Sequence, residues 1–179
     1  GSVPNEVLEV DPAVVDAFLG RIKDPPPMDT SGGKAEAISI DSGFRAIMFT
    51  DLKDSTLMTT LYGDAKALHL LHIHNALTRN SLKAHRGHEV KHTGDGIMAS
   101  FSSVASSVEA AIVIQRRLAE REGDPSLEVR IGISAGEPVS DNEDLFGAAV
   151  QLAARLCAAS EPRRISVSVA VRELCVGKR

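Results

Sequence analysis

The sequence has too few cysteines for a disulfide-stapled fold, since Cys157 and Cys175 are the only two in 179 residues. Both lie in apolar surroundings with helical spacing, so we expect them to be reduced core residues. No apolar run approaches the roughly 20 residues that a membrane-spanning helix needs, and the chain shows no secretory signal pattern. These absences predict a cytoplasmic segment without a membrane span.

Basic residues are not in excess either. The chain has 20 Lys and Arg residues against 24 Asp and Glu residues, a formal net charge of −4 at pH 7. Nucleic-acid-binding domains usually present a broad basic face, so we expect no nucleic-acid partner. The length suffices for one domain with an adequate core and a tail.

Residues 1–43 differ in composition from the rest of the chain. Gly1 and Ser2 are typical of an expression tag, Asp11–Leu19 could form a short helix, and Pro25–Pro27 would end it. The glycines, serine and threonine that follow are typical of a flexible linker. We therefore interpret residues 1–43 as a tag, short helix and linker from an upstream regulatory region, and residues 44–179 as one domain.

Hydrophobic periodicity predicts a βαββαβ order, which is an α+β, ferredoxin-like core with an antiparallel sheet and helices on one face. A polar loop, a helix, a strand and a short helix should follow. The expected core strands are Phe44–Thr50, Glu89–Thr93, Ile97–Phe101 and Glu128–Ala135. The core helices are Ser55–His85, interrupted near Gly63, and a helix capped by Ser102 or Ser103 that runs to about Arg121. The later elements are the loop Ser140–Glu143, the helix Gly147–Ala159, the strand Arg164–Ser168 and the helix Val169–Cys175.

The first helical region carries an apolar stripe at helical spacing, which should face the core. Its members are Leu57, Leu61, Ala65, Leu68 and Leu71, and Leu70, Ile73 and Leu77 widen it. Three histidines occur in the same region, His69, His72 and His74. Because no acid or cysteine completes a metal-ligand set with them, we interpret them as a solvated helix face.

Two aspartates follow short semi-apolar runs, in positions where a carboxylate could bind a ligand or a metal ion. Asp51 comes just after the apolar run of Phe44–Thr50, and Asp95 lies in a Gly-Asp-Gly turn of a predicted hairpin. Taken singly, Asp51 could merely cap a helix and Asp95 could be an ordinary turn residue. If the strands are neighbours, the carboxylates meet and repel unless a cation lies between them. Oxygen ligands of this kind suit Mg²⁺ or Mn²⁺ and a phosphate substrate.

Four motifs, in order, resemble the catalytic domain of the class III adenylate and guanylate cyclases. Together they are far more specific than any one alone. They are FTDLKDST at Phe49–Thr56, VKHTGDGIMASF at Val90–Phe101, VRIGISAGE at Val129–Glu137 and DLFGAAVQLAARL at Asp144–Leu156.

The resemblance implies an adenylate cyclase, in which the ribose 3′-hydroxyl of ATP attacks its own α-phosphate to give cyclic AMP and pyrophosphate. By position in the motifs, Asp51, the carbonyl of Leu52 and Asp95 match the family's ligands for two Mg²⁺ or Mn²⁺ ions. Arg130 matches an arginine that contacts the triphosphate, and Arg155 matches the arginine that neutralises charge in the transition state.

The resemblance also assigns base selection to Lys91 and Asp144. A lysine donates to adenine N1 and an aspartate accepts from the exocyclic amine, whereas guanine presents the opposite pattern. The pair therefore favours ATP over GTP. In this family the metal ligands come from one subunit and the base-binding and transition-state residues from the other, which implies a homodimer with sites at the subunit interface.

The sequence departs from the family at three places. Gln151 stands where the family usually has an asparagine that holds the ribose, and Asp54 stands where it commonly has glycine. The family also usually continues with another strand pair beyond the last predicted helix, whereas this sequence stops at Arg179. We therefore expect a domain that lacks its C-terminal strands, with reduced activity and an altered or absent dimer.

These departures leave rival functions open. A degenerate cyclase could serve as a nucleotide-binding or dimerisation module, which Gln151 and Asp54 favour and the remaining site residues oppose. A guanylate cyclase is disfavoured by Lys91 and Asp144. A polymerase-type nucleotidyl transferase would use the same metal pair, but it would not need those two residues.

Overall fold

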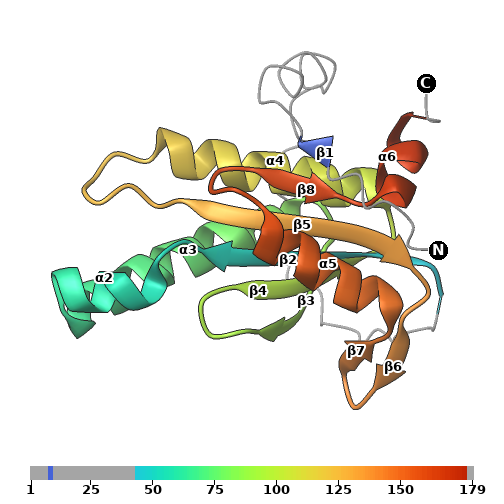
Figure 1. Ribbon diagram of the computed structural model, residues 1–179, viewed down its shortest axis with the longest axis horizontal. Helices are drawn as coiled ribbons and strands as arrows, with labels where there is room; N and C mark the ends of the chain where they lie inside the picture. The colour runs from blue at the N-terminus through green and yellow to red at the C-terminus, as the bar shows by residue number, and fades with distance from the viewer. Residues whose placement is uncertain (1–7, 10–42, 177–179) are drawn as a thin grey trace, which may run out of the picture.

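The computed structural model describes residues 8–9 and 43–176 of the chain (Figure 1). The strands are β1 (Leu8–Glu9), β2 (Arg45–Leu52), β3 (His88–His92), β4 (Ile97–Phe101), β5 (Val129–Gly136), β6 (Val139–Asp141), β7 (Asp144–Phe146) and β8 (Ile165–Val167). The helices are α2 (Ser55–Tyr62), α3 (Asp64–Ala84), α4 (Val104–Glu120), α5 (Ala148–Ala159) and α6 (Val169–Val176).

Six strands form one sheet in the order β1-β8-β5-β2-β4-β3. The segment from β2 to β5 has the predicted βαββαβ order, and its strands pair antiparallel, so the predicted α+β, ferredoxin-like class is confirmed. Among the described strands of this sheet, one pair departs from the antiparallel pattern, since β8 pairs with β5 in parallel. That pairing is reached through α5, as a parallel connection requires a crossover.

Strand β2 lies inside the sheet and separates two apolar layers. Ala46 and Met48 belong to the larger core cluster with α3 and α4, while Ile47 packs with Met98 and Ala153 on the opposite face. Successive side chains of a strand point to opposite faces, so β2 is apolar on both. Figure 1 shows α5 crossing the near face of the sheet, with α3 and α4 on the far face.

Close packing of α5 on the sheet depends on Gly132 in β5. A Cβ atom at this position would overlap the backbone of Ala153 and Cys157. Cys157 is buried there, and burial raises the pKa of its thiol to about 12. It is a free core cysteine, as predicted, and Cys175 of α6, also free, is partly buried and packs against the larger cluster.

The predicted apolar stripe of the first helical region is only partly correct. Gly63 separates α2 from α3 as expected, but Leu57, Leu61 and Leu68 are 49%, 63% and 53% exposed. The reason is visible in Figure 1, where α2 and the start of α3 extend past the end of the strands. Only the later turns of α3 cover the sheet, so helical spacing alone could not identify the buried part.

Among the three histidines, His69 and His72 are exposed, as predicted, but His74 is 0% exposed. The prediction of a solvated face is therefore wrong for His74. Its two ring nitrogens lie within hydrogen-bonding distance of Asn75 and Thr78, which satisfies a polar ring in the interior.

Two segments that we predicted to be irregular form strands. The loop at Ser140–Glu143 is part of the β6–β7 hairpin, whose turn residues Asn142 and Glu143 both have positive φ, as a tight two-residue hairpin needs. Leu8–Glu9 pairs antiparallel with β8 as β1. The rest of the predicted tag, helix and linker lies outside the described residues.

Candidate active site

The site begins with a cross-strand pair at the end of β2. Asp51 lies directly opposite Arg130 of β5, and the Arg130 Nη2 atom forms an ion pair with the Asp51 Oδ2 atom. The Arg130 Nη1 atom donates to the carbonyl of Ala158 at 3.1 Å. Two neighbouring strands in fixed register thus hold a carboxylate and a guanidinium together.

Asp95 reaches the same place because its turn is fastened to the end of β2. The Leu52 amide donates to the Asp95 carbonyl at 2.9 Å, and the Ile97 amide donates to the Thr50 hydroxyl at 3.0 Å. Gly96 has no room for a Cβ atom, which would overlap the Thr50 carbonyl. This close approach requires glycine, so the Gly-Asp-Gly sequence serves packing as well as turn formation.

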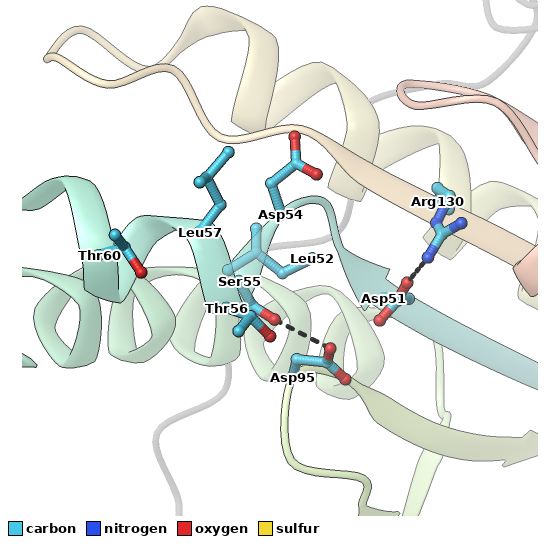
Figure 2. Close-up of a pocket in the computed structure, with 9 residues that line it drawn as sticks. All are labelled: Asp51, Leu52, Asp54, Ser55, Thr56, Leu57, Thr60, Asp95 and Arg130. Carbon is cyan, nitrogen blue, oxygen red and sulfur yellow. Dashed lines mark hydrogen bonds and ion pairs between the residues drawn. The ribbon is translucent and has the colours of Figure 1, made fainter.

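Both aspartates line one open pocket of about 440 Å³ (Figure 2). The Asp95 Oδ2 atom accepts a hydrogen bond of 3.0 Å from the Ser55 hydroxyl at the start of α2. Ser55 was not predicted as a site residue, because nothing near Ser55 in the sequence indicates that its hydroxyl reaches Asp95, 40 residues away. The lining residues are Asp51, Leu52, Asp54, Ser55, Thr56, Leu57, Thr60, Asp95 and Arg130.

The electrostatics of this pocket suit a cation. Burial raises the pKa of the Asp51 carboxyl above its ordinary value, and the nearby Asp95 adds to the rise, although the hydrogen bond from Arg130 opposes it. Two carboxylates that destabilise each other's charge are relieved by a positive ion between them.

The donor set fits Mg²⁺ or Mn²⁺ better than a softer metal. The carboxylates of Asp51 and Asp95 offer oxygen donors, and Leu52, whose carbonyl is the third predicted ligand, lines the same pocket. Within the described ranges, no cluster of three or more His, Cys, Asp or Glu side chains could hold a metal on its own. A site with two carboxylates is typical of Mg²⁺ that is also bound by substrate phosphates.

Asp54, a departure from the family pattern, has a conformational explanation. Its φ of 55° is left-handed, a region that favours glycine and that aspartate tolerates better than most residues. Its carboxylate points away from Asp51 and Asp95 (Figure 2) and lies 3.8 Å from the Lys53 ammonium. The acid at this position therefore does not face the two other carboxylates.

A second cluster lies at the β6–β7 hairpin. The Lys91 Nζ atom of β3 lies 2.6 Å from the Asp144 Oδ2 atom of β7, although the residues are 53 positions apart. The hydrogen bond from Lys91 holds the pKa of the Asp144 carboxyl below its ordinary value. The Lys91 ammonium also lies 5.9 Å from the centre of the exposed Phe146 ring. The structure thus brings the two predicted base-selecting residues into contact.

Gln151 and Arg155 are not brought to the pocket. They are one helical turn apart on α5, both are exposed, and neither lines the pocket with Asp51 and Asp95. Within one copy of the chain, the metal-binding candidates and the α5 candidates therefore remain separate.

Comparison with known proteins gives the family. The sequence profile described as "Adenylate and Guanylate cyclase catalytic domain" matches residues 42–176. A protein named "Adenylate cyclase" from Podospora anserina is 30% identical over 170 residues, covering 79% of this chain and 8% of its own length. Another protein named "Adenylate cyclase", from Mycosarcoma maydis, is 33% identical over 69% of this chain and 6% of its own length. The chain therefore spans less than a tenth of these two relatives.

Solved structures agree with the fold. A crystal structure titled "Adenylate/Guanylate Cyclase/Hydrolase" from Silicibacter pomeroyi superimposes with a TM-score of 0.65 at 33% identity, over 76% of this chain and 82% of that one. A rhodopsin-guanylyl cyclase core "with converted specificity in complex with ATPalphaS" reaches a TM-score of 0.71 over 75% of this chain and 82% of that one. At 19% identity it supports the fold alone.

Proposed function

The chain belongs to the family of adenylate and guanylate cyclase catalytic domains, and we propose that it converts ATP into 3′,5′-cyclic AMP and pyrophosphate. The observation that carries the choice of ATP is the contact of 2.6 Å between Lys91 and Asp144. The names of the relatives from Podospora anserina and Mycosarcoma maydis support the same choice.

The Lys91–Asp144 pair would select the base by hydrogen-bond polarity. The ammonium would donate to adenine N1, and the Asp144 carboxylate would accept from the exocyclic amine. Guanine would place a donor at N1 and an acceptor at O6 against these groups, leaving polar groups unpaired. An unpaired group costs about 1–3 kcal/mol when it is buried. Phe146, exposed beside the pair, gives the base an apolar neighbour.

At the other end of the nucleotide, Asp51, the carbonyl of Leu52 and Asp95 would hold two Mg²⁺ or Mn²⁺ ions. Such ions lower the pKa of an attacking hydroxyl and screen phosphate charge. Arg130, whose guanidinium is already beside the carboxylates, would contact the triphosphate. Ser55 would orient the Asp95 carboxylate through its hydrogen bond.

The separation of α5 from the pocket is the reason to propose a homodimer. Lys91, Asp144, Gln151 and Arg155 of a second copy would complete the site. The first two would bind the base, Gln151 would lie at the ribose, and Arg155 would neutralise charge on the α-phosphoryl oxygens. A two-fold axis then gives two equivalent sites. Because the chain covers only a small part of its relatives' length, we include an upstream regulatory region in the proposal.

One observation favours a second candidate, a domain that binds nucleotide without efficient turnover. Gln151 is one methylene longer than the family's asparagine and lies exposed on α5. The ion pair of 3.8 Å between Asp54 and Lys53 weakens the other argument for this candidate, since the ammonium offsets the charge that Asp54 brings to the pocket lining.

A product assay tests the proposal. The protein is incubated with ATP or GTP, each with Mg²⁺ and with Mn²⁺, and cyclic nucleotides and pyrophosphate are measured. With either metal, we expect more cyclic AMP from ATP than cyclic GMP from GTP. Equal turnover of GTP would contradict the base assignment, and nucleotide binding without any product would support the second candidate.

A further inference from the structure

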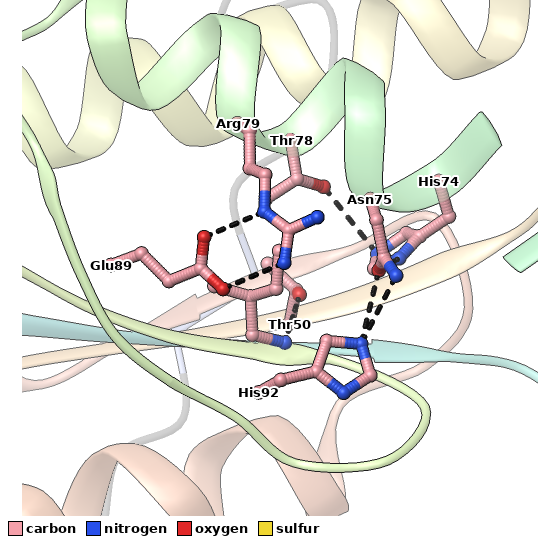
Figure 3. A network of polar contacts seen from close by, with 8 residues as sticks. Thr50, His74, Asn75, Thr78, Arg79, Glu89 and His92 are labelled. Carbon is pink, nitrogen blue, oxygen red and sulfur yellow. Dashed lines mark hydrogen bonds and ion pairs between the residues drawn. The ribbon is translucent and has the colours of Figure 1, made fainter. Parts of the chain in front are cut away.

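Polar side chains fill the contact between α3 and β3 (Figure 3). At one end, Arg79 donates two hydrogen bonds to the Glu89 carboxylate, of 2.7 and 2.9 Å. At the other end, a chain of contacts links histidines and an asparagine. We call this group the α3–β3 seam; its members are His74, Asn75, Thr78, Arg79, Glu89 and His92.

The backbone fixes which nitrogen of His92 carries the proton. The Gly94 amide can only donate, so the His92 Nδ1 atom, at 3.2 Å, must accept and is unprotonated. In a neutral ring the Nε2 atom then carries the proton and donates to the Asn75 Oδ1 atom at 3.3 Å. The Asn75 Nδ2 atom lies 3.1 Å from the same nitrogen, but a protonated Nε2 cannot accept from it.

The same assignment continues into the interior. The His74 Nδ1 atom, 3.1 Å from Asn75 Oδ1, donates to it, and the His74 Nε2 atom accepts from the Thr78 hydroxyl at 3.5 Å. Burial lowers the pKa of His74 below its ordinary value, which keeps its ring neutral. One arrangement of protons thus gives a partner to each of the four ring nitrogens of His74 and His92, while the Asn75 Nδ2 atom takes no part in it.

This series of hydrogen bonds ends at Gly94, beside a candidate metal ligand. Gly94 directly precedes Asp95, whose own carbonyl is bonded by the Leu52 amide of β2. The turn is therefore held from two sides, by β2 through Asp95 and by α3 through Asn75, His92 and Gly94. A bond to the backbone next to a ligand restricts the direction of its carboxylate, as outer partners of metal ligands do.

We propose that His92 and Asn75 are positioning residues, which fix the Gly94 amide and thereby hold the Asp95 carboxylate in its metal-binding orientation toward Asp51. This inference rests on the proposed function, in which Asp95 is a metal ligand. A purely structural role is already served by Arg79 and Glu89, which fasten α3 to β3 at the other end of the seam. His92 adds the bond to the turn itself, which the ion pair does not reach.

The test compares the same substitution at two histidines of β3. His92→Phe keeps a ring but removes both nitrogens, and His88→Phe makes the same change at the far end of the strand, opposite Ser100. The dissociation constant for Mn²⁺ alone is measured by electron paramagnetic resonance, with the melting temperature of each variant. His92→Gln, which can both accept and donate, is the conservative variant.

We expect His92→Phe to weaken Mn²⁺ binding roughly tenfold, the lower end of the range for outer partners of metal ligands. His88→Phe should stay within about twofold of the unmodified chain, His92→Gln should recover part of the loss, and both Phe variants should melt alike. Nitrogen-15 spectra of the unmodified protein should show His92 protonated at Nε2 and not at Nδ1.

Three results would overturn the inference. They are equal Mn²⁺ affinity in the two Phe variants, a loss of affinity that follows melting temperature in both, and a His92 protonated at Nδ1. The product assay separates this failure from failure of the proposed function. A chain that shows the expected Mn²⁺ differences but makes no cyclic nucleotide contradicts the function alone, and an active chain with unchanged Mn²⁺ affinity in His92→Phe contradicts the inference alone.

Discussion

The two ends of the candidate site differ in how the chain fixes them. At the carboxylate end, Asp51 and Asp95 are partly buried and held by strand register, a tight turn and the α3–β3 seam. At the base end, Lys91 and Asp144 meet through one contact between β3 and a short hairpin, while Gln151 and Arg155 are exposed on α5. A single copy of the fold thus holds the two carboxylates close together and leaves Gln151 and Arg155 exposed to solvent.

The largest expected effect comes from removing the carboxylate end. Asp51→Ala and Asp95→Ala should each lower kcat by at least about a hundredfold, since preorganised charge at a reacting phosphate is worth this much or more. Circular dichroism should show a folded domain, because neither carboxylate belongs to the apolar core. Glu120→Ala, an exposed acid at the end of α4, is the control. Unchanged cyclic-nucleotide production in either aspartate variant would refute the metal assignment.

Mixing variants of the two ends tests whether they come from different copies. Asp51→Ala and Arg155→Ala should each be inactive alone. In an equal mixture about half of the dimers are mixed, and each mixed dimer has one intact site of two, so roughly a quarter of the unmodified activity should return. The measurement is cyclic AMP formation after subunit exchange. No recovery, in a mixture shown by mass spectrometry to contain mixed dimers, would place both ends in one copy.

Base choice should respond to the Lys91–Asp144 pair and not to the carboxylate end. Lys91→Glu combined with Asp144→Cys should shift the ratio of kcat/KM for ATP over GTP toward GTP by roughly tenfold or more, from a mismatch of about 1–3 kcal/mol per unpaired group. Competition assays with both nucleotides measure the ratio. An unmodified chain that uses GTP as readily as ATP would show that this pair does not select the base.

The pH dependence of stability should identify the buried part of the seam. The folded-state pKa of His74 is lowered by burial, so its contribution to stability is present above the unfolded value of about 6.5 and is lost as pH falls below it toward the folded pKa. One proton costs up to about 1.4 kcal/mol per pH unit in that window. Urea unfolding at several pH values should show this slope reduced in His74→Gln but not in His69→Gln, an exposed residue of α3. The same slope in both variants would contradict the assignment.

The smallest expected effect is at Gln151. Gln151→Asn should keep kcat or raise it by up to about threefold, because the shorter amide restores the family's usual reach to the ribose at little energetic cost. The control is Gln151→Ala, which removes the amide and should lower the rate. A large loss in Gln151→Asn would show that the partner surface is shaped for glutamine.

Much of the fold followed from local patterns. The break at Gly63, the hairpin around Asp95 and a serine cap at the start of α4 were all predictable, because each depends on residues within a few positions. The burial of α3 was not. Leu68 is exposed and His74 is buried, and what decides this is where the helix leaves the sheet, which helical spacing does not record.

The candidate site divides in the same way. The motifs of the sequence alone predicted roles for Asp51, Asp95, Lys91 and Asp144, through their resemblance to the cyclase family. Only the tertiary structure decided that Arg130 lies opposite Asp51, that the Asp54 carboxylate points away from Asp51 and Asp95, and that His92 reaches both Gly94 and Asn75. Each of these depends on the register of strands and the packing of a helix on a hairpin, and such contacts join residues that no local pattern relates.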